Sequence, residues 1–236
     1  MAEELGKIEK PPVDSFKKGR KLFFVPVIYQ GEGLSGDYVD KWNKYWEQVE
    51  KQLAELTAKL GEIKKIFHEL IAVSGKEGAE SIKALNAGSH RVVMNCLEKN
   101  AQFEALEDAE NLAEFMDWSR CLMIGLESQK VVSKVYDSYT EAGKKRNEAI
   151  ARKIEESLKE NEIGVALMRE NHHVQFPPDI QVFYVAPPAL DEIKRWLREY
   201  ESKAVQEAAE EAKKEPEKEP EKEPEKEPDK KTEKRE

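Results

Sequence analysis

Two adjacent histidines stand in a polar loop near the end of the chain, where an imidazole could transfer protons or bind a metal ion. His172 and His173 follow the apolar run Ile163–Met168, which predicts a buried strand, and Ile180–Val185 predicts a second strand beyond them. In open α/β sheets, ligands bind beyond the carboxyl ends of the strands. This loop is therefore the first candidate site.

Two charged residues from other parts of the chain could join this loop. Glu69 ends a predicted strand within Ile63–Val73, and Arg146 opens a predicted helix, 146–160, that leads into the strand before His172. A guanidinium there could reach an anionic substrate or a carboxylate, or it could simply lie at a solvated helix end. We expect Glu69, Arg146 and His172 to meet at one pocket, and we take them as the candidate catalytic residues.

The paired histidines also raise the question of a metal site. Adjacent residues in an extended loop point in opposite directions, so both rarely bind one ion. A metal site needs three or more ligands, and no local H-E-x-x-H pair is present. The further candidate ligands at strand ends are Glu32, Asp37, His68 and Glu69. We assign no metal ligands, although a divalent metal remains open as a cofactor.

A glycine-rich turn, with Gly31, Gly33 and Gly36, matches G-x-G-x-x-G between a predicted strand and a predicted helix. This context suits dinucleotide binding, in which an acidic residue about 20 positions on binds the ribose. Here the next predicted strand ends near Glu69, more than 30 positions beyond Gly36. A tight turn, anion binding by loop N–H groups at the helix start, and nucleotide binding all remain open.

The elements that must position these residues follow from apolar spacing. Lys21–Tyr29 predicts the first strand, and a helix running to about Leu60 follows it. The helix stripe could pack on a sheet or form an intermolecular coiled coil; it consists of Tyr38, Trp42, Trp46, Val49, Leu53, Leu56 and Leu60. Gln102–Leu106 predicts another strand. Further helices are expected at 79–86, 90–99 with Ser89 as cap, 108–118, 119–139 with a break at Gly143, 146–160 and 189–212.

These elements predict one α/β domain over residues 21–200, with a mixed, mostly parallel sheet of about four to six strands flanked by helices. The β-α-β order implies that the first two strands are parallel. Residues 1–20 are expected to be a flexible lead-in. Residues 201–236 hold a helix end and a tail that repeats Lys-Glu-Pro-Glu, which we expect to be disordered because proline every fourth residue forbids helix and strand ladder alike.

Composition excludes several classes of protein. The net charge is −9 with no dominant basic patch, which argues against nucleic acid as a partner. No stretch approaches the roughly 20 apolar residues of a membrane span, and the N-terminus lacks the apolar segment of a signal peptide. Cys96 and Cys121 fit no disulfide framework or ligand pair. We therefore expect a cytoplasmic protein.

The order of these pieces resembles the superfamily that holds TraB, ChaN, Tiki and erythromycin-esterase-like proteins. The matching pieces span about residues 21–186; they are Gly31-Glu32, Phe67-His68-Glu69, Arg146-Asn147-Glu148-Ala149-Ile150-Ala151 and Asn171-His172. The resemblance implies a hydrolase, sometimes metal-dependent, with Glu69, Arg146 and His172 in its site. The first turn lacks the family's histidine and the last lacks its glycine, and these departures imply a divergent or inactive site.

Three functional hypotheses follow. The first is a degenerate hydrolase-like pocket at the strand ends, acting on an unknown substrate. The second is a non-catalytic scaffold that contacts a partner, or a second copy of itself, through helix 38–60 or the Lys-Glu-Pro tail. The third is nucleotide or anion binding at Gly31–Gly36.

Overall fold

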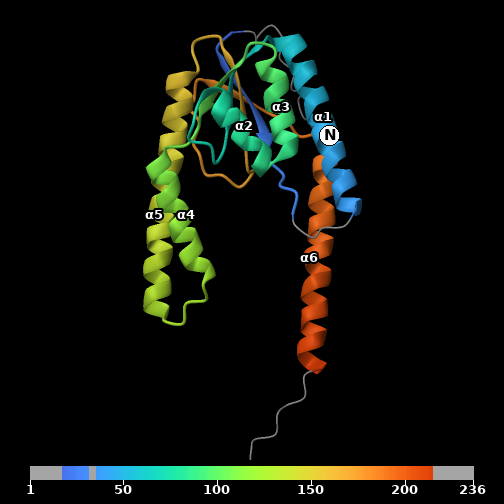
Figure 1. Ribbon diagram of the computed structural model, residues 1–236, viewed down its shortest axis with the longest axis vertical. Helices are drawn as coiled ribbons and strands as arrows, with labels where there is room; N and C mark the ends of the chain where they lie inside the picture. The colour runs from blue at the N-terminus through green and yellow to red at the C-terminus, as the bar shows by residue number, and fades with distance from the viewer. Residues whose placement is uncertain (1–17, 32–35, 215–236) are drawn as a thin grey trace, which may run out of the picture. The chain divides into compact units, whose positions relative to one another are not determined.

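Five strands form a single sheet in which every neighbouring pair is parallel (Figure 1). The structure is a computed structural model. It describes residues 18–31 and 36–214, with side chains up to residue 206. The strand order is β3-β2-β4-β1-β5. The strands are β1 (Arg20–Pro26), β2 (Ile63–His68), β3 (Gln102–Ala105), β4 (Ile163–Met168) and β5 (Ile180–Tyr184). The predicted α/β fold is thus confirmed, but the sheet is wholly parallel and not mixed, so all five carboxyl ends meet at one edge.

The central strands are apolar because helices cover both faces of the sheet. All six residues of β4 are buried, as expected of a parallel strand enclosed on both sides. β1 and β2 are parallel, as predicted, but β4 lies between them. β1 ends at Pro26, earlier than the predicted Tyr29, and the backbone N–H of Val27 still bonds the carbonyl of Met168 at 2.9 Å.

On one face lie α1 (Gly36–Leu60), α2 (Gly75–Leu85) and α3 (Ala87–Leu97). α1 buries most of its predicted stripe within the same chain: Tyr38, Trp42, Trp46, Val49 and Leu53, together with Tyr45. A side chain that is already buried cannot form a seam with another copy, so an intermolecular coiled coil through this stripe is unsupported. α3 packs close to α1, since a Cβ built on Gly88 would lie 2.2 Å from the Trp46 ring.

The predicted start of α3 was wrong. Asn86, not Ser89, is the N-cap, because its side-chain oxygen accepts a hydrogen bond from the Ser89 N–H at 3.0 Å. Ser89 lies inside the helix, and its hydroxyl contacts the buried His68 ring at 3.0 Å. The first turn of α3 is therefore tied to the end of β2.

The predicted boundaries between residues 118 and 146 were also wrong. α4 (Ala109–Met123) and α5 (Gln129–Ser157) are two helices that lie side by side as a hairpin (Figure 1). The chain turns at Gly125, which has a left-handed φ of +71°, and α5 continues through Gly143. A Cβ on Gly143 would lie 3.4 Å from the Phe115 ring, an ordinary contact, so α4 packs beside this part of α5.

α5 covers the other face of the sheet. Its Ile150 and Ile154, with Leu158 just beyond its end, join a buried cluster that includes Leu22, Phe24 and Phe67 from the strands. The last helix, α6, spans Pro188–Lys214. Residues up to Lys194 belong to the unit that holds the sheet, and residues from Arg195 onward form a second unit, in which the rings of Trp196 and Tyr200 stack at 5.1 Å.

Among the residues that the structure describes, no helix combines the length and apolar character needed to cross a bilayer. The predicted flexible lead-in covered residues 1–20, but Arg20 already belongs to β1, so its predicted end was wrong. Residues 1–17 and the Lys-Glu-Pro tail lie outside the described ranges.

Candidate functional site

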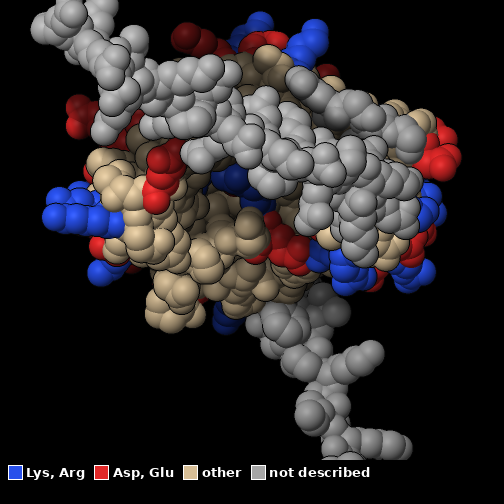
Figure 2. All heavy atoms as spheres, turned by 90° about the horizontal axis from the view of Figure 1, so that it is seen from below, with Lys and Arg blue, Asp and Glu red and all other residues tan. Residues whose placement is uncertain are grey.

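A cavity of about 850 Å³ opens at the carboxyl edge of the sheet, and we call it the edge pocket. Its lining comes from the end of β2, from the end of β4 and the loop after it, and from α4 and α5. Figure 2 views the molecule from the side of this edge and shows basic atoms recessed behind an uncharged surface, with acidic atoms beside them. Glu69, Arg146 and His172 all line this pocket.

Glu69 is almost fully buried, with 2% of its surface exposed. Its carboxylate accepts hydrogen bonds from the Tyr29 hydroxyl at 3.0 Å and from Nε of Arg169 at 3.3 Å. A buried carboxylate needs such partners because its desolvation is otherwise too costly. Burial and the neighbouring Glu69 charge raise the pKa of Tyr29, so its hydroxyl remains a donor. Glu69 is therefore an anchored carboxylate whose charge Arg169 balances.

The chain turns sharply just after Glu69. Leu70 has a left-handed φ of +67°, and its N–H bonds the carboxylate of Glu107 at 2.9 Å. Glu107 follows β3 closely and is itself buried, with 6% of its surface exposed. The ends of two strands are thus joined through one carboxylate.

Arg146 provides the counter-charge for Glu107. Its Nε donates to Glu107 at 2.9 Å, and a second guanidinium nitrogen bonds the other carboxylate oxygen. The guanidinium also lies over the Phe115 ring, 5.0 Å from its centroid. The predicted position of Arg146 at a helix start was wrong, because it lies in the interior of α5. It joins α5, α4 and the strand ends, and its charge is already paired.

His172 lies in the loop after β4, and its ring contacts those of Phe24 and Phe176, with centroid distances of 4.9 and 5.4 Å. Its Nδ1 accepts a hydrogen bond from the backbone N–H of Val174 at 3.2 Å, which places the proton of the neutral ring on Nε2. Burial lowers the pKa of His172, against an opposing effect of the Glu69 charge. Near neutral pH this imidazole is therefore an uncharged hydrogen-bond donor.

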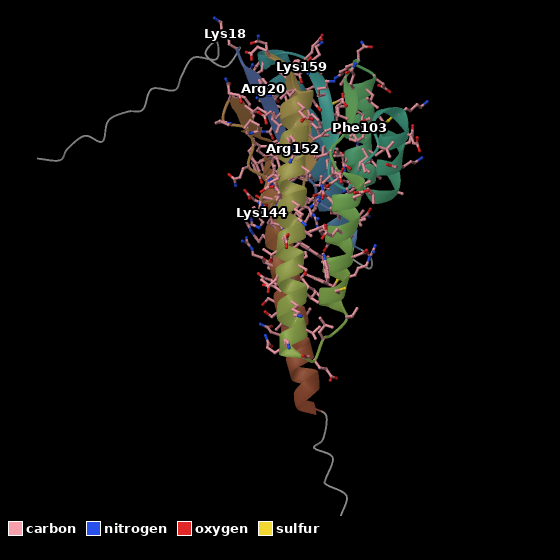
Figure 3. The ribbon with its side chains drawn as sticks, turned by 90° about the vertical axis from the view of Figure 1, so that its left-hand side faces the viewer. Lys18, Arg20, Phe103, Lys144, Arg152 and Lys159 are labelled. Atoms are coloured by element: carbon pink, nitrogen blue, oxygen red, sulfur yellow. The ribbon has the colours of Figure 1, made fainter. Side chains whose placement is uncertain are left out.

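The pocket also holds a basic side chain that has no protein partner. Arg152 is exposed on α5 and, within the described ranges, makes no hydrogen bond or ion pair. One face of α5 supplies both Arg152 and Lys144, which Figure 3 labels along the helix. Lys144 has only a loose pairing with Glu148, at 3.9 Å, between exposed side chains. Eight residues separate Lys144 from Arg152, which at 1.5 Å per residue is about 12 Å along the axis.

The pocket lining offers N–H donors beside two exposed carboxylates of α5, Glu148 and Glu155. The two buried carboxylates, Glu69 and Glu107, are both used as acceptors by arginines. Arg169 uses only its Nε on Glu69, and its side chain is 44% exposed, so its terminal N–H groups face solvent. His172 Nε2–H and Arg152 add further donors. Such a set suits an anionic group, because hydrogen bonds to charged acceptors are the strong ones.

Sequence reasoning did not select Tyr29, Glu107, Arg152 or Arg169 as site residues. Arg169 directly follows the apolar run of β4, and Glu107 follows that of β3, so the strand-end rule that selected Glu69 could have found both. Nothing in the local sequence marks Arg152, because only the packing of α5 on the sheet turns it toward the cavity.

The described residues form no binding site at the other two predicted positions, the glycine-rich turn and the metal site. Gly31 and Gly36 are exposed, and Gly33 lies outside the described residues. Among the described side chains, no group of three or more His, Cys, Asp and Glu is placed to hold a metal ion. Comparison with protein-family models, curated proteins and solved structures finds no match to the chain.

Proposed function

We propose that the edge pocket binds a small organic anion, and that it does so without the machinery for efficient turnover. The observation that carries this proposal is the pairing of both buried carboxylates, Glu69 with Arg169 and Glu107 with Arg146. These pairs leave the outer N–H groups of Arg169, together with Arg152, as free donors, although Glu148 and Glu155 of α5 also line the pocket. Aromatic rings of Phe115, Tyr136 and Tyr139 form one wall, so the anion is expected to carry a planar or apolar portion.

Calorimetric titration of the full chain with phenyl phosphate tests this proposal, with benzyl alcohol as the uncharged comparison. Phenyl phosphate is expected to bind and benzyl alcohol is not. Arg152→Gln should weaken binding about tenfold, the equivalent of one charge-assisted hydrogen bond. Lys134→Gln is the matched control, because Lys134 is an exposed cation on α5 away from the pocket lining. Equal affinity in both variants, or no binding of phenyl phosphate at millimolar concentration, would contradict the proposal.

Hydrolysis is the second candidate, favoured by one observation: Glu69, Arg146 and His172 line the same pocket. These are the residues implied by the resemblance to the TraB, ChaN, Tiki and erythromycin-esterase-like superfamily. A hydrolase needs a base that can accept a proton from water. Here His172 presents an N–H, and Glu69 already accepts from two donors.

Glu69→Gln separates the two candidates. If Glu69 only anchors Arg169, removing its charge should leave phenyl phosphate binding at least as tight as in the unchanged protein, because Arg169 is then released for the anion. If Glu69 is a catalytic base, the same variant should abolish turnover of an aryl ester or aryl phosphate. Measurable, Glu69-dependent turnover would favour hydrolysis over simple binding.

A further inference from the structure

The charged side chains around the edge pocket balance one another. Among the described residues that line it, four are basic and three are acidic: Lys144, Arg146, Arg152 and Arg169 against Glu69, Glu148 and Glu155. Glu107, which pairs with Arg146, adds a fourth acidic group beside the cavity. Binding sites complement the charges of their ligands. A pocket with equal numbers of both signs therefore suits a ligand that itself carries both.

Ion pairs within the chain account for most of these charges. Three pairs neutralise six of the eight groups: Glu69 with Arg169, Glu107 with Arg146 and, loosely at 3.9 Å, Glu148 with Lys144. The two that remain are Arg152 and Glu155. Both are exposed on α5, and neither side chain makes a hydrogen bond or ion pair with the residues that the structure describes. The unused charges of the pocket are thus one cation and one anion.

Arg152 and Glu155 lie three residues apart, which is about 4.5 Å along the helix axis. Side chains at this spacing are neighbours on a helix surface, and opposite charges there can pair with each other. Here they do not pair, and both line the same cavity. A single exposed charge is commonly just hydrated. A neighbouring cation and anion on one pocket wall, however, offer a contact for each end of a zwitterion.

Arg20 of β1 reaches the same part of α5 but does not neutralise Glu155. Its guanidinium donates to the backbone carbonyl of Glu155 at 2.8 Å, while two of its nitrogens bond the carboxylate of Asp179, both at 2.7 Å. The first contact holds the backbone of Glu155 in place, and the second uses the charge of Arg20. The side-chain carboxylate of Glu155 is therefore left for a cation from outside the chain.

We propose that the anion bound in the edge pocket also carries an ammonium group, so that the ligand is an organic zwitterion. This inference rests on the proposed function and specifies the class of its ligand. The anionic group binds Arg152 and the outer N–H groups of Arg169, and the ammonium group binds the carboxylate of Glu155. Both ends then form charge-assisted hydrogen bonds, which are the strong ones.

Calorimetric titration of the full chain with two matched ligands tests this proposal. 4-(Aminomethyl)benzoate is a zwitterion, and 4-methylbenzoate has the same ring and carboxylate without the ammonium group. The zwitterion is expected to bind about tenfold more tightly, the equivalent of one hydrogen bond between charged groups. Equal or weaker binding of the zwitterion would overturn the inference, while binding of 4-methylbenzoate would leave the proposed function standing. If neither ligand nor phenyl phosphate binds at millimolar concentration, both proposals are wrong.

Glu155→Gln assigns the ammonium contact to one residue. This variant should bind the zwitterion about tenfold more weakly, but 4-methylbenzoate at least as tightly as before, because a negative charge has been removed from the pocket. Glu156→Gln is the matched control and should change neither affinity, since Glu156 is exposed on the same helix but outside the pocket lining. A Glu155→Gln protein that still prefers the zwitterion tenfold, or that loses both ligands equally, would contradict the assignment.

Discussion

Breaking the buried ion pair between Arg146 and Glu107 should cost far more when one partner is removed than when both are. The carboxylate of Glu107 is fully buried, and 9% of the Arg146 side chain is exposed. Either Arg146→Met or Glu107→Leu leaves a buried charge without its counter-charge, which costs about 3–5 kcal/mol of unfolding free energy. The double variant replaces the pair by apolar side chains, an exchange that is often nearly neutral.

The backbone N–H of Leu70 limits how much stability the double variant recovers. The Leu70 N–H bonds Glu107 at 2.9 Å and loses its acceptor in both Glu107→Leu and the double variant. An unsatisfied buried N–H costs about 1–3 kcal/mol, which is therefore the expected cost of the double variant. The sum of the single effects would be about 6–10 kcal/mol, so the two sites should show a coupling of about 3 kcal/mol or more.

Urea unfolding measures this cycle, with the midpoint and the slope fitted for each variant. The exposed pair Lys145–Glu141, at 3.3 Å within α5, is the control, and Lys145→Met with Glu141→Gln should show coupling below about 0.5 kcal/mol. A double variant of Arg146 and Glu107 that costs as much as the sum of its single variants would refute the reasoning, because the two groups would then act independently.

Three further outcomes are expected. Gly88→Ala should destabilise the fold by about 1–3 kcal/mol, measured by urea unfolding, because its Cβ would lie 2.2 Å from the Trp46 ring. Gly143→Ala should be neutral or stabilising by up to about 1 kcal/mol, since its Cβ would make an ordinary 3.4 Å contact in a helix. Because burial lowers the pKa of His172 below 6.5, the folded chain binds fewer protons there than the unfolded chain, and the unfolding free energy should fall as pH drops through 6.5. His172→Phe should reduce the fall in unfolding free energy between pH 7.5 and 5.5. An unchanged dependence on pH in this variant would contradict the prediction.

Much of the architecture was accessible from apolar patterns alone. β4 has the predicted bounds, Ile163–Met168, because a short, wholly apolar run fits a strand enclosed on both faces. Its place between β1 and β2 could not be foreseen, since such a run suits any central position. The break predicted at Gly143 was wrong for a similar reason. α5 continues through Gly143 beside Phe115 of α4, which lies 28 positions away in the sequence.

In the site, too, features set by neighbouring residues could be predicted, whereas contacts between distant residues could not. Strand ends are visible in the sequence, so Glu69 and His172 could be selected and both line the edge pocket. The partner of each charge is not visible. Arg146 was selected to reach an anion or a carboxylate, and its partner in the fold is Glu107, a residue that the sequence reasoning left out.

The two ion pairs have a shared consequence for how the pocket is built. Each joins a carboxylate that follows a strand end, Glu69 after β2 or Glu107 after β3, to an arginine from a pocket wall. A buried carboxylate holds its arginine strongly because separation would leave an uncompensated charge. The wall formed by α5 is therefore fixed through Arg146, while Arg169, which is 44% exposed and bonds Glu69 only through Nε, keeps its outer nitrogens free. An incoming anion can thus bind Arg169 without breaking either pair, so the pocket needs no large rearrangement to accept a ligand.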